Sequence, residues 1–296
     1  MLKKIAIEDE DYPELLRIIK DPPEMIFCKG RYTKDIFDRC LGVVGSRRLT
    51  PYGKKVIETV ISSLVYTDIT IVSGFMYGAD AHAHKISLDS GLTTVAVMPC
   101  GIEVIHPSYQ EDLYNRMLRS DSVILSELPG NTPPRKWYYP KRNRIVAGLC
   151  KAVLIVEAEP NSGSLITAGL ANEYNRKVFA VPGSIFSTQS LGCLGIINSY
   201  AEGVYSGERI VKYYYGEAYP SYIVVQESDT QVGISNEKSL KEDIEVQILR
   251  LIKSDPVDID SLASILGVSI ARLNTIVVRM CLSGYLQEIG GKYYIC

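Results

Sequence analysis

Residues 41–53 read LGVVGSRRLTPYG, an apolar run that ends in a glycine and is soon followed by a proline. The apolar run at 41–45 is typical of a strand covered on both faces, and a helical pattern at 52–65 follows it. Gly45 allows a sharp turn at the end of the strand, and Pro51 suits the first turn of a helix. This stretch therefore predicts a strand, a tight turn and a helix.

Short apolar runs and amphipathic helical patterns alternate in the same way from about residue 40 to 205. A series of this kind predicts an α/β fold, namely an extended Rossmann-like, doubly wound and mostly parallel sheet with right-handed crossovers. The predicted strands cover residues 41–45, 69–73, 93–98, 122–125, 152–157 and 177–181. The predicted helices cover residues 52–65, 79–90, 109–120, 143–150 and 164–174.

The flanking segments differ from this central pattern. Residues 1–38 are expected to form an N-terminal lead-in packed on the sheet, and 39–215 to form the Rossmann-like domain. Residues 216–240 are polar and turn-rich, so we expect a linker, which can hold one extra strand at 222–226. Residues 241–296 are expected to form a small winged-helix domain.

The winged-helix prediction rests on the order of three helical patterns and a hairpin. The helical patterns cover residues 241–254, 260–266 and 270–283. The hairpin sequence GYLQEIGGKYYI follows them, with Gly290 and Gly291 at its turn.

Composition excludes several classes of protein. The chain has 296 residues, 46% hydrophobic and 22% charged, with a formal net charge of −2. This charge argues against coating duplex DNA by bulk electrostatics, so any nucleic-acid site must be local. There is no apolar run of 18 residues and no signal-like N-terminus, which favours a cytoplasmic protein without membrane partners. The seven cysteines include no CxxC pair and are expected to be reduced thiols.

Two turns at predicted strand ends are candidate anion sites. Ser46 and Arg47 follow the first strand, where a helix N-terminus at the carboxyl edge of a sheet attracts phosphate. The spacing is not GxGxxG, so a dinucleotide site is not indicated. In the second turn Gly74 ends a strand, and Asp80 is placed to cap the next helix. His82 and His84 lie two residues apart, which suits packing or hydrogen bonding better than a metal site.

Two further segments add cations, aromatic rings and small polar residues. Residues 132–149 read TPPRKWYYPKRNRIVAGL, where cations interleave with aromatic rings as single-stranded nucleic acid requires. We assign Tyr139 to DNA contact, the alternative being a basic rim on an aromatic-covered edge. In the strand-to-helix turn of VLIVEAEPNSGSLITAGLA, Ser162, Gly163 and Ser164 make a backbone anion nest plausible, although good helix caps use the same residues.

Taken in order, these motifs resemble the DprA/Smf family from YPELL at residue 12 to about residue 205. The resemblance implies a Rossmann-like domain that binds single-stranded DNA as a homodimer and helps load a RecA-type recombinase in natural transformation or recombination. We expect no catalytic residue, metal or cofactor. The phosphate-binding pocket that it implies consists of Ser46, Arg47, Gly74, Lys141, Arg142, Asn143, Arg144 and Ser162 to Ser164.

This sequence departs from the family at two places. The family commonly has Arg where this chain has Tyr77, and Asn with a following basic residue where it has Leu194 and Gly195. The pocket thus loses one cation, although Tyr77 is also able to stack on a base. The third helix of the C-terminal domain carries few cations, so we expect an accessory role for this domain rather than DNA reading.

Two other functions stay open at this point. One is a nucleoside-phosphate-processing Rossmann enzyme of the lonely-guy type, but its PGGxGTxxE run is absent. Glu127 and Glu157, which end strands, are the candidate bases, although capping a turn or contact with solvent suits each of them better. The other is a pure interaction protein with an idle basic pocket. Residues 195–200 and 213–215 are candidate dimer surfaces.

Overall fold

The computed structural model divides into two compact units, residues 1–227 and 228–296, which are described separately. Within the first unit the structure describes residues 2–65 and 67–216. Within the second it describes residues 248–249, 251–252, 257–266, 268, 270–282 and 286–295.

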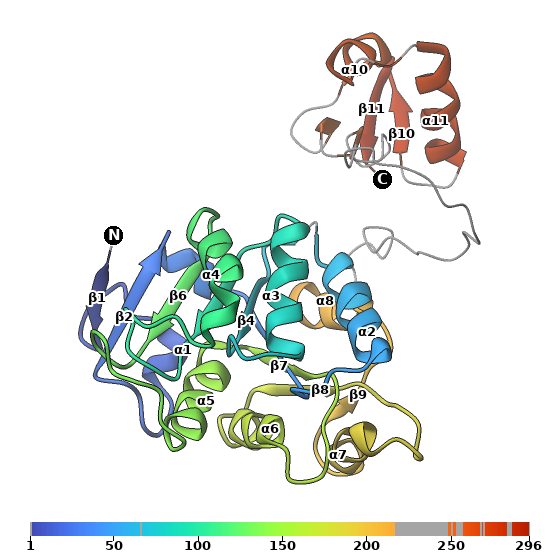
Figure 1. Ribbon diagram of the computed structural model, residues 1–296. Coiled ribbons are helices and arrows are strands. Elements are labelled where there is room, and N and C mark those ends of the chain that lie inside the picture. Colours follow the sequence, from blue (N-terminus) through green and yellow to red (C-terminus); the bar gives the residue numbers. More distant parts are fainter. Residues whose placement is uncertain are drawn as a thin grey trace. The chain divides into compact units, whose positions relative to one another are not determined.

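A nine-stranded sheet forms the centre of the first unit (Figure 1). Its order is β1-β2-β6-β5-β4-β3-β7-β8-β9, parallel from β6 to β9, with β1 and β2 antiparallel at one edge. The strands are β1 (Lys3–Ala6), β2 (Met25–Gly30), β3 (Cys40–Val44), β4 (Thr70–Ser73), β5 (Thr94–Val97), β6 (Val123–Ser126), β7 (Ala152–Ile155), β8 (Lys177–Ala180) and β9 (Glu202–Gly203). The predicted α/β, doubly wound, mostly parallel sheet is confirmed, and each of the six predicted strands ends within two residues of its predicted bounds.

Helices cover both faces of this sheet, as the alternation along β3 requires. Leu41 and Val43 pack toward one face, whereas Cys40 and Val44 pack toward the other. The first face carries α2 (Pro51–Ser62), α3 (Ala79–Asp89), α4 (Glu111–Leu118) and α8 (Glu208–Tyr215). The second carries α1 (Glu14–Arg17), α5 (Tyr138–Leu149), α6 (Gly163–Glu173) and α7 (Thr188–Ile197). The first unit also contains two short 3-10 helices, η1 (Lys34–Phe37) and η2 (Ser108–Gln110).

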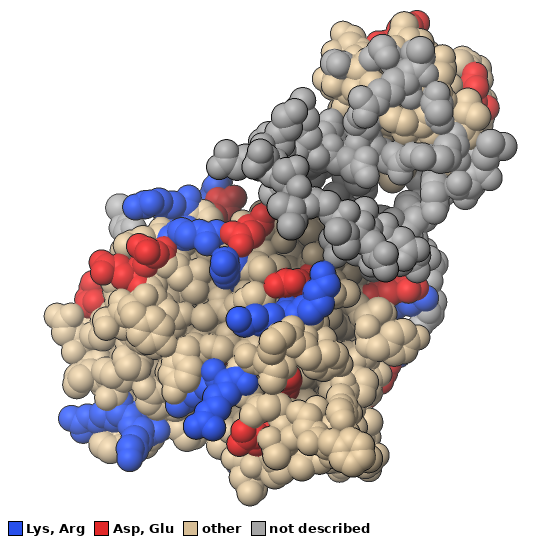
Figure 2. All heavy atoms as spheres, turned by 45° about the vertical axis from the view of Figure 1, so that its right-hand side comes forward, with Lys and Arg blue, Asp and Glu red and all other residues tan. Residues whose placement is uncertain are grey.

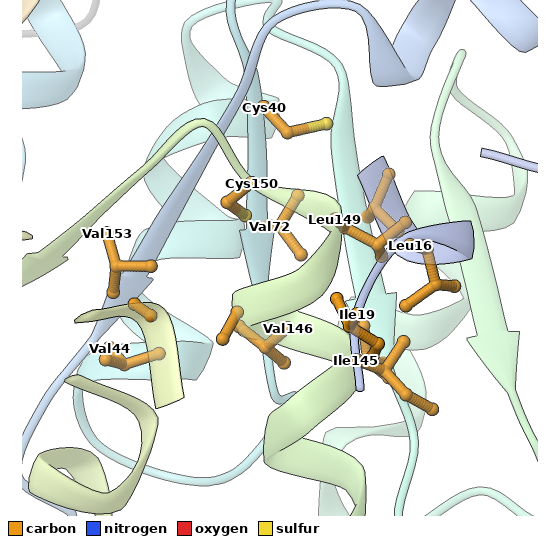
Figure 3. Close-up of a cluster of buried hydrophobic side chains, with 14 of the residues drawn as sticks. Leu16, Ile19, Cys40, Val44, Val72, Ile145, Val146, Leu149, Cys150 and Val153 are labelled. Carbon is orange, nitrogen blue, oxygen red and sulfur yellow. The ribbon is translucent and has the colours of Figure 1, made fainter. Parts of the chain in front are cut away.

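The N-terminal lead-in contributes two strands to the sheet itself. Figure 3 shows Leu16 beside Leu149, and Ile19 beside Ile145, in the buried cluster that joins the lead-in to α5. The buried Tyr12 hydroxyl donates a 2.7 Å hydrogen bond to a lead-in carbonyl oxygen. These contacts fix the position of α5 against the sheet.

The predicted start of α5 was wrong. The prediction began the helix at Asn143 and gave Pro140 to the preceding turn, whereas the helix begins at Tyr138. Pro140 is then the third helical residue, where a backbone N–H has no partner within the helix and a proline is tolerated. Tyr139 is therefore a helical residue, which fixes the direction of its ring.

The second unit contains α10 (Ile259–Leu266), α11 (Ile270–Leu282) and a hairpin of β10 (Leu286–Ile289) and β11 (Lys292–Ile295). Gly290 and Gly291 both have positive φ, 62° and 79°, as a type I′ hairpin turn requires. The linker beyond residue 216, the strand predicted at 222–226 and most of the helix predicted at 241–254 lie outside the described residues. The winged helix stays a prediction. In the part of the chain that the structure describes, no helix is long and apolar enough to cross a membrane.

Candidate nucleic-acid interface

Three strand-to-helix turns and the start of α5 surround one cavity at the carboxyl edge of the sheet. The cavity has a volume of about 540 Å³ and lies over the ends of β4, β3 and β7. The chain leaves β3 toward β4 and leaves β7 toward β8, so this is the point where the strand order reverses. Ligands of open α/β sheets bind at this kind of position.

The turn after β3 is held by hydrogen bonds on both sides. The Ser46 hydroxyl accepts from the backbone N–H of Arg48 at 3.0 Å, and the Ser46 carbonyl accepts from that of Ala79 at 3.1 Å. Glu157, buried at the end of β7, accepts from the Thr50 backbone N–H at 2.9 Å and from its hydroxyl at 2.5 Å. Glu157 therefore anchors the turn and does not line the cavity.

Two buried opposite charges, Arg142 of α5 and Asp80 of α3, lie beside the turn after β4 and line the cavity. The Arg142 guanidinium donates through Nη1 to the Gly74 and Val97 carbonyls. A Cβ at Gly74 would overlap this guanidinium, so the close approach requires glycine. Burial raises the pKa of Asp80 and lowers that of Arg142, while the attraction between the two charges opposes both shifts.

The predicted role of Asp80 as a helix cap was wrong. Asp80 is the second residue of α3, and Gly78 occupies the N-cap position. The Asp80 carboxylate instead accepts from the backbone N–H of Met76 at 3.3 Å, and it faces Arg142. Gly78 has φ of 82°, and a Cβ there would overlap the Ser46 carbonyl and the Arg47 backbone. This glycine therefore lets the second turn pack against the first.

The N-terminus of α6 forms another wall of the cavity. Ser162 is its N-cap and accepts from the Ser164 backbone N–H at 3.3 Å. Asn143 of α5 donates through Nδ2 to the Gly163 carbonyl at 3.3 Å. A helix N-terminus presents unpaired N–H groups and a partial positive charge, which suit an anion.

Arg47 lies between two aromatic rings. Its guanidinium carbon is 5.5 Å from the centroid of Tyr77 and 5.3 Å from that of Tyr139, within the range of cation–π contacts. Tyr139 in turn pairs its hydroxyl with Nε2 of His106 at 2.8 Å. Arg47 and Tyr77 are exposed, so the charge and a ring face are both available to a ligand.

The structure brings together most, but not all, of the predicted site. The cavity lining includes Ser46, Arg47, Gly74, Tyr139, Arg142, Asn143, Ser162, Gly163 and Ser164. Lys141 and Arg144 do not line it, because α5 turns them to its other side. There both pair with Glu127, at 3.1 and 2.6 Å, and Arg144 also contacts Asp21 at 3.2 Å.

Some residues of the lining were not assigned from the sequence. Arg48, Glu159 and Asn161 line the cavity, as does Tyr77, which was noted only as a departure from the family. Arg48 could have been predicted from the sequence, because it follows Arg47 directly in a turn that was expected to bind an anion. His82 and His84 confirm the hydrogen-bonding prediction, with Glu58 and Thr94 as their partners.

The charges around the cavity are local. The lining carries the cations Arg47, Arg48 and Arg142, together with the carboxylates of Asp80 and Glu159. On the face drawn in Figure 2, Lys and Arg form separate groups between uncharged and acidic surface rather than one continuous basic area. The arrangement is able to bind an anion and to stack a flat ring beside it.

A family model described as DNA recombination-mediator protein A matches residues 3–215. The chain belongs to this family. The matched residues include every strand and helix of the first unit and all the segments that line the cavity.

Curated relatives agree with this assignment. The chain is 38% identical over 209 residues to DNA processing protein DprA of Bacillus subtilis, covering 71% of this chain and 70% of that protein. It is 31% identical over 314 residues to Protein Smf of Synechocystis sp., covering 97% of this chain and 78% of that protein. The second alignment extends beyond residue 215 into the C-terminal part.

Two solved structures are similar in fold and sequence. The structure of DNA processing protein A from Streptococcus pneumoniae has a TM-score of 0.67 and 39% identity, covering 71% of this chain and 73% of that one. DNA processing protein A from Helicobacter pylori has a TM-score of 0.64 and 27% identity, covering 73% and 96%. The study of that protein concerns its single-stranded DNA binding mode.

His84, next to the buried charge pair, generates a prediction for the pH dependence of stability. The Thr94 hydroxyl donates to the Ile71 carbonyl at 2.9 Å, so it accepts from Nδ1 of His84 at 2.7 Å. Nε2 is then unprotonated, and it has no hydrogen-bond partner among the described residues. Burial, followed by the charge of Arg142, lowers the pKa of His84 from 6.5 to about 3.

Because the unfolded chain binds a proton at His84 below pH 6.5 and the folded chain does not until about pH 3, stability falls as pH drops through this window. We expect His84 to remove about 2 kcal/mol of unfolding free energy on going from neutral pH to about pH 5. The substitution His84→Gln keeps a donor for the Thr94 hydroxyl and removes the part of this pH dependence that His84 contributes. Urea unfolding at both pH values measures the unfolding free energy of the two proteins. An identical pH dependence in both would contradict a buried, neutral His84.

Proposed function

We propose that this chain is a cytoplasmic single-stranded DNA binding protein and that the cavity at the carboxyl edge of its sheet holds the strand. The observation that carries the proposal is the exposed Arg47 guanidinium held between Tyr77 and Tyr139. A single strand needs a cation for its phosphates and a ring face for its unstacked bases, and this arrangement supplies both side by side. A fixed guanidinium also loses little side-chain entropy on binding.

Within this proposal the lining residues divide into two roles. Arg47, Asn143 and the N-terminus of α6, with Ser162, Gly163 and Ser164, contact phosphate, and Tyr139 supports base stacking. Arg142 is buried, fixes the carbonyl ends of two strands and adds positive potential from below. Lys141 and Arg144 hold α5 in place through Glu127 and contact no DNA.

Fluorescence anisotropy with labelled oligothymidylate and with a duplex of the same length tests the proposal. We expect tighter binding of the single strand, with an affinity that falls steeply between about 50 and about 200 mM salt. Arg47→Ala is expected to lose about 1–3 kcal/mol of binding free energy with unchanged thermal stability.

A matched control removes the same charge elsewhere. Arg31 is exposed and lies at the opposite edge of the sheet, where it pairs with Asp121 at 2.6 Å. Arg31→Ala should leave DNA affinity unchanged. Equal losses of DNA affinity in both variants would show that the total charge of the protein matters and not this cavity, and would contradict the proposal.

We also propose that the bound strand is passed to a RecA-type recombinase. Membership of a family described as recombination mediators supports this step. The test measures ATP hydrolysis by the recombinase on a strand precoated with single-strand binding protein. Adding this chain should shorten the lag before hydrolysis begins, and Arg47→Ala should restore the lag. A lag of unchanged length with the unaltered chain would rule out the mediator step.

A homodimer is the assembly that we propose. Exposed apolar side chains in α7 and in the turn before it support it, since Ile185 and Phe186 are 68% and 92% exposed and Leu191 is 40% exposed. The candidate surface expected at residues 195–200 begins in the last turn of the same helix. In the other candidate surface, at residues 213–215, the Tyr214 hydroxyl donates to the Cys40 carbonyl. This hydrogen bond holds α8 on the sheet, so Tyr214 is used within the chain. Light scattering should give twice the chain mass, and Phe186→Asp should give the monomer mass. A monomer at all concentrations would reject the dimer.

A further inference from the structure

A second hollow of about 500 Å³ lies beside the cavity, on the face of the sheet that carries α2, α3 and α4. Figure 1 shows these three helices side by side. The hollow shares Arg47 and Arg48 with the cavity, so the two are continuous across the turn after β3. The function proposed above uses only the cavity.

Exposed cations line this second hollow, which we call the groove. Arg48, Lys54 and Lys85 are exposed, and within residues 2–65 and 67–216 none of them pairs with a carboxylate. Arg116 also lines the groove, but it pairs with Asp89 at 2.5 Å. The one carboxylate of the lining is Asp112. The groove therefore has positive charge that the fold does not neutralise.

Lys54 is placed unfavourably for the stability of α2. Lys54 lies at the N-terminal end of α2, close to its Pro51 start, and the first turn of this helix contains no acidic residue. The positive end of a helix dipole favours carboxylates and disfavours cations at this position. The helix dipole therefore gives no reason for a lysine at this position, and its charge is exposed in the groove.

Two tyrosines connect the cavity to the groove. Tyr109 lines the groove and is 69% exposed, and Tyr77 lines the cavity and is 42% exposed. Arg47 and Arg48 line both hollows. Arg47 rests on the ring of Tyr77. One ring therefore lies at the boundary between the two hollows, beside Arg47, and a second ring lines the groove.

We propose that the groove formed by Arg48, Lys54, Lys85 and Tyr109 is a second subsite for the same nucleic-acid strand. It takes the nucleotides that follow those in the cavity, and the strand crosses between the two over Tyr77. The inference rests on the proposed function, because it extends the strand that the cavity holds. A single strand fits better than a duplex, since only unpaired bases present faces to the two tyrosines.

The double variant Lys54→Ala/Lys85→Ala tests the subsite in the full chain. Affinity is measured for oligothymidylates from about 4 to about 16 nucleotides, the range of known single-strand sites. For the unaltered chain it should rise with length in two steps, and the double variant should lose the second step only. On long strands the slope of log affinity against log salt should become shallower by about 1.4, or about 0.7 for each phosphate that a lysine no longer neutralises.

Lys4→Ala/Lys151→Ala is the matched control. Lys4 and Lys151 are exposed, line neither hollow, and give the same change in net charge; Lys151 precedes the amino end of β7. This variant should keep both length steps. Thermal unfolding of both double variants checks the fold, and removing Lys54 should leave the melting temperature of the first unit unchanged or slightly raised.

A second pair of variants tests the ring. Tyr109→Ala should weaken binding of long strands about tenfold and leave short strands unaffected, because one base no longer has a ring to stack on. Tyr109→Phe should bind as the unaltered chain does.

The outcomes separate this inference from the proposed function. Equal losses on short and long strands, or a double variant that behaves like its control, would overturn the second subsite alone. A loss confined to duplex binding would assign the groove to duplex DNA and would also overturn it. Failure of the unaltered chain to bind any single strand would reject both.

Discussion

The buried guanidinium of Arg142 is the contact on which the candidate site depends. It donates to carbonyl groups at the ends of β4 and β5 and faces the Asp80 carboxylate at the start of α3. A single side chain of α5 thus joins two neighbouring strands by hydrogen bonds and attracts a carboxylate of a helix on the opposite face of the sheet. The two carbonyls accept hydrogen bonds from this cation, and the attraction of the nearby carboxylate offsets part of the cost of burying its charge. Because Gly74 leaves room for the contact, the turn after β4 and the position of α5 are determined together.

The rotation of α5 then decides which cations serve the site. Tyr139, Arg142, Asn143 and Val146 all line the cavity, a spacing of three or four residues that belongs to one face of a helix. Lys141 and Arg144 fall on another face, where Glu127 pairs with both. A run of basic residues in the sequence is therefore divided by helical geometry into a part that meets the ligand and a part that holds the helix.

Local pattern was enough to predict the parallel core of the fold. Strands such as β3 and β7 are continuous apolar runs between turn residues, and their lengths leave little freedom in the bounds. The two antiparallel strands β1 and β2 were not predicted, because pairing across an edge depends on partners far away in the sequence. The start of α5 was misplaced because a proline is compatible with the first helical turn as well as with a turn before it.

For the site, sequence identified the turns but not the roles of their side chains. Ser46, Arg47 and the turn at Ser162 were found because small residues at strand ends indicate an anion site. The link from Glu157 to Thr50 and the pair of Asp80 and Arg142 were not, since both join residues more than 60 positions apart. Such contacts exist only once the sheet order is known.

The cavity has a further consequence for how the chain responds to its ligand. Its walls come from four segments spread from residue 44 to residue 167, so no short fragment of the chain can reproduce the site. Occupancy and global folding of this unit are therefore thermodynamically linked, and a bound strand protects the entire sheet from unfolding. For a protein that meets its ligand intermittently, resistance to proteolysis then rises and falls with the supply of that ligand.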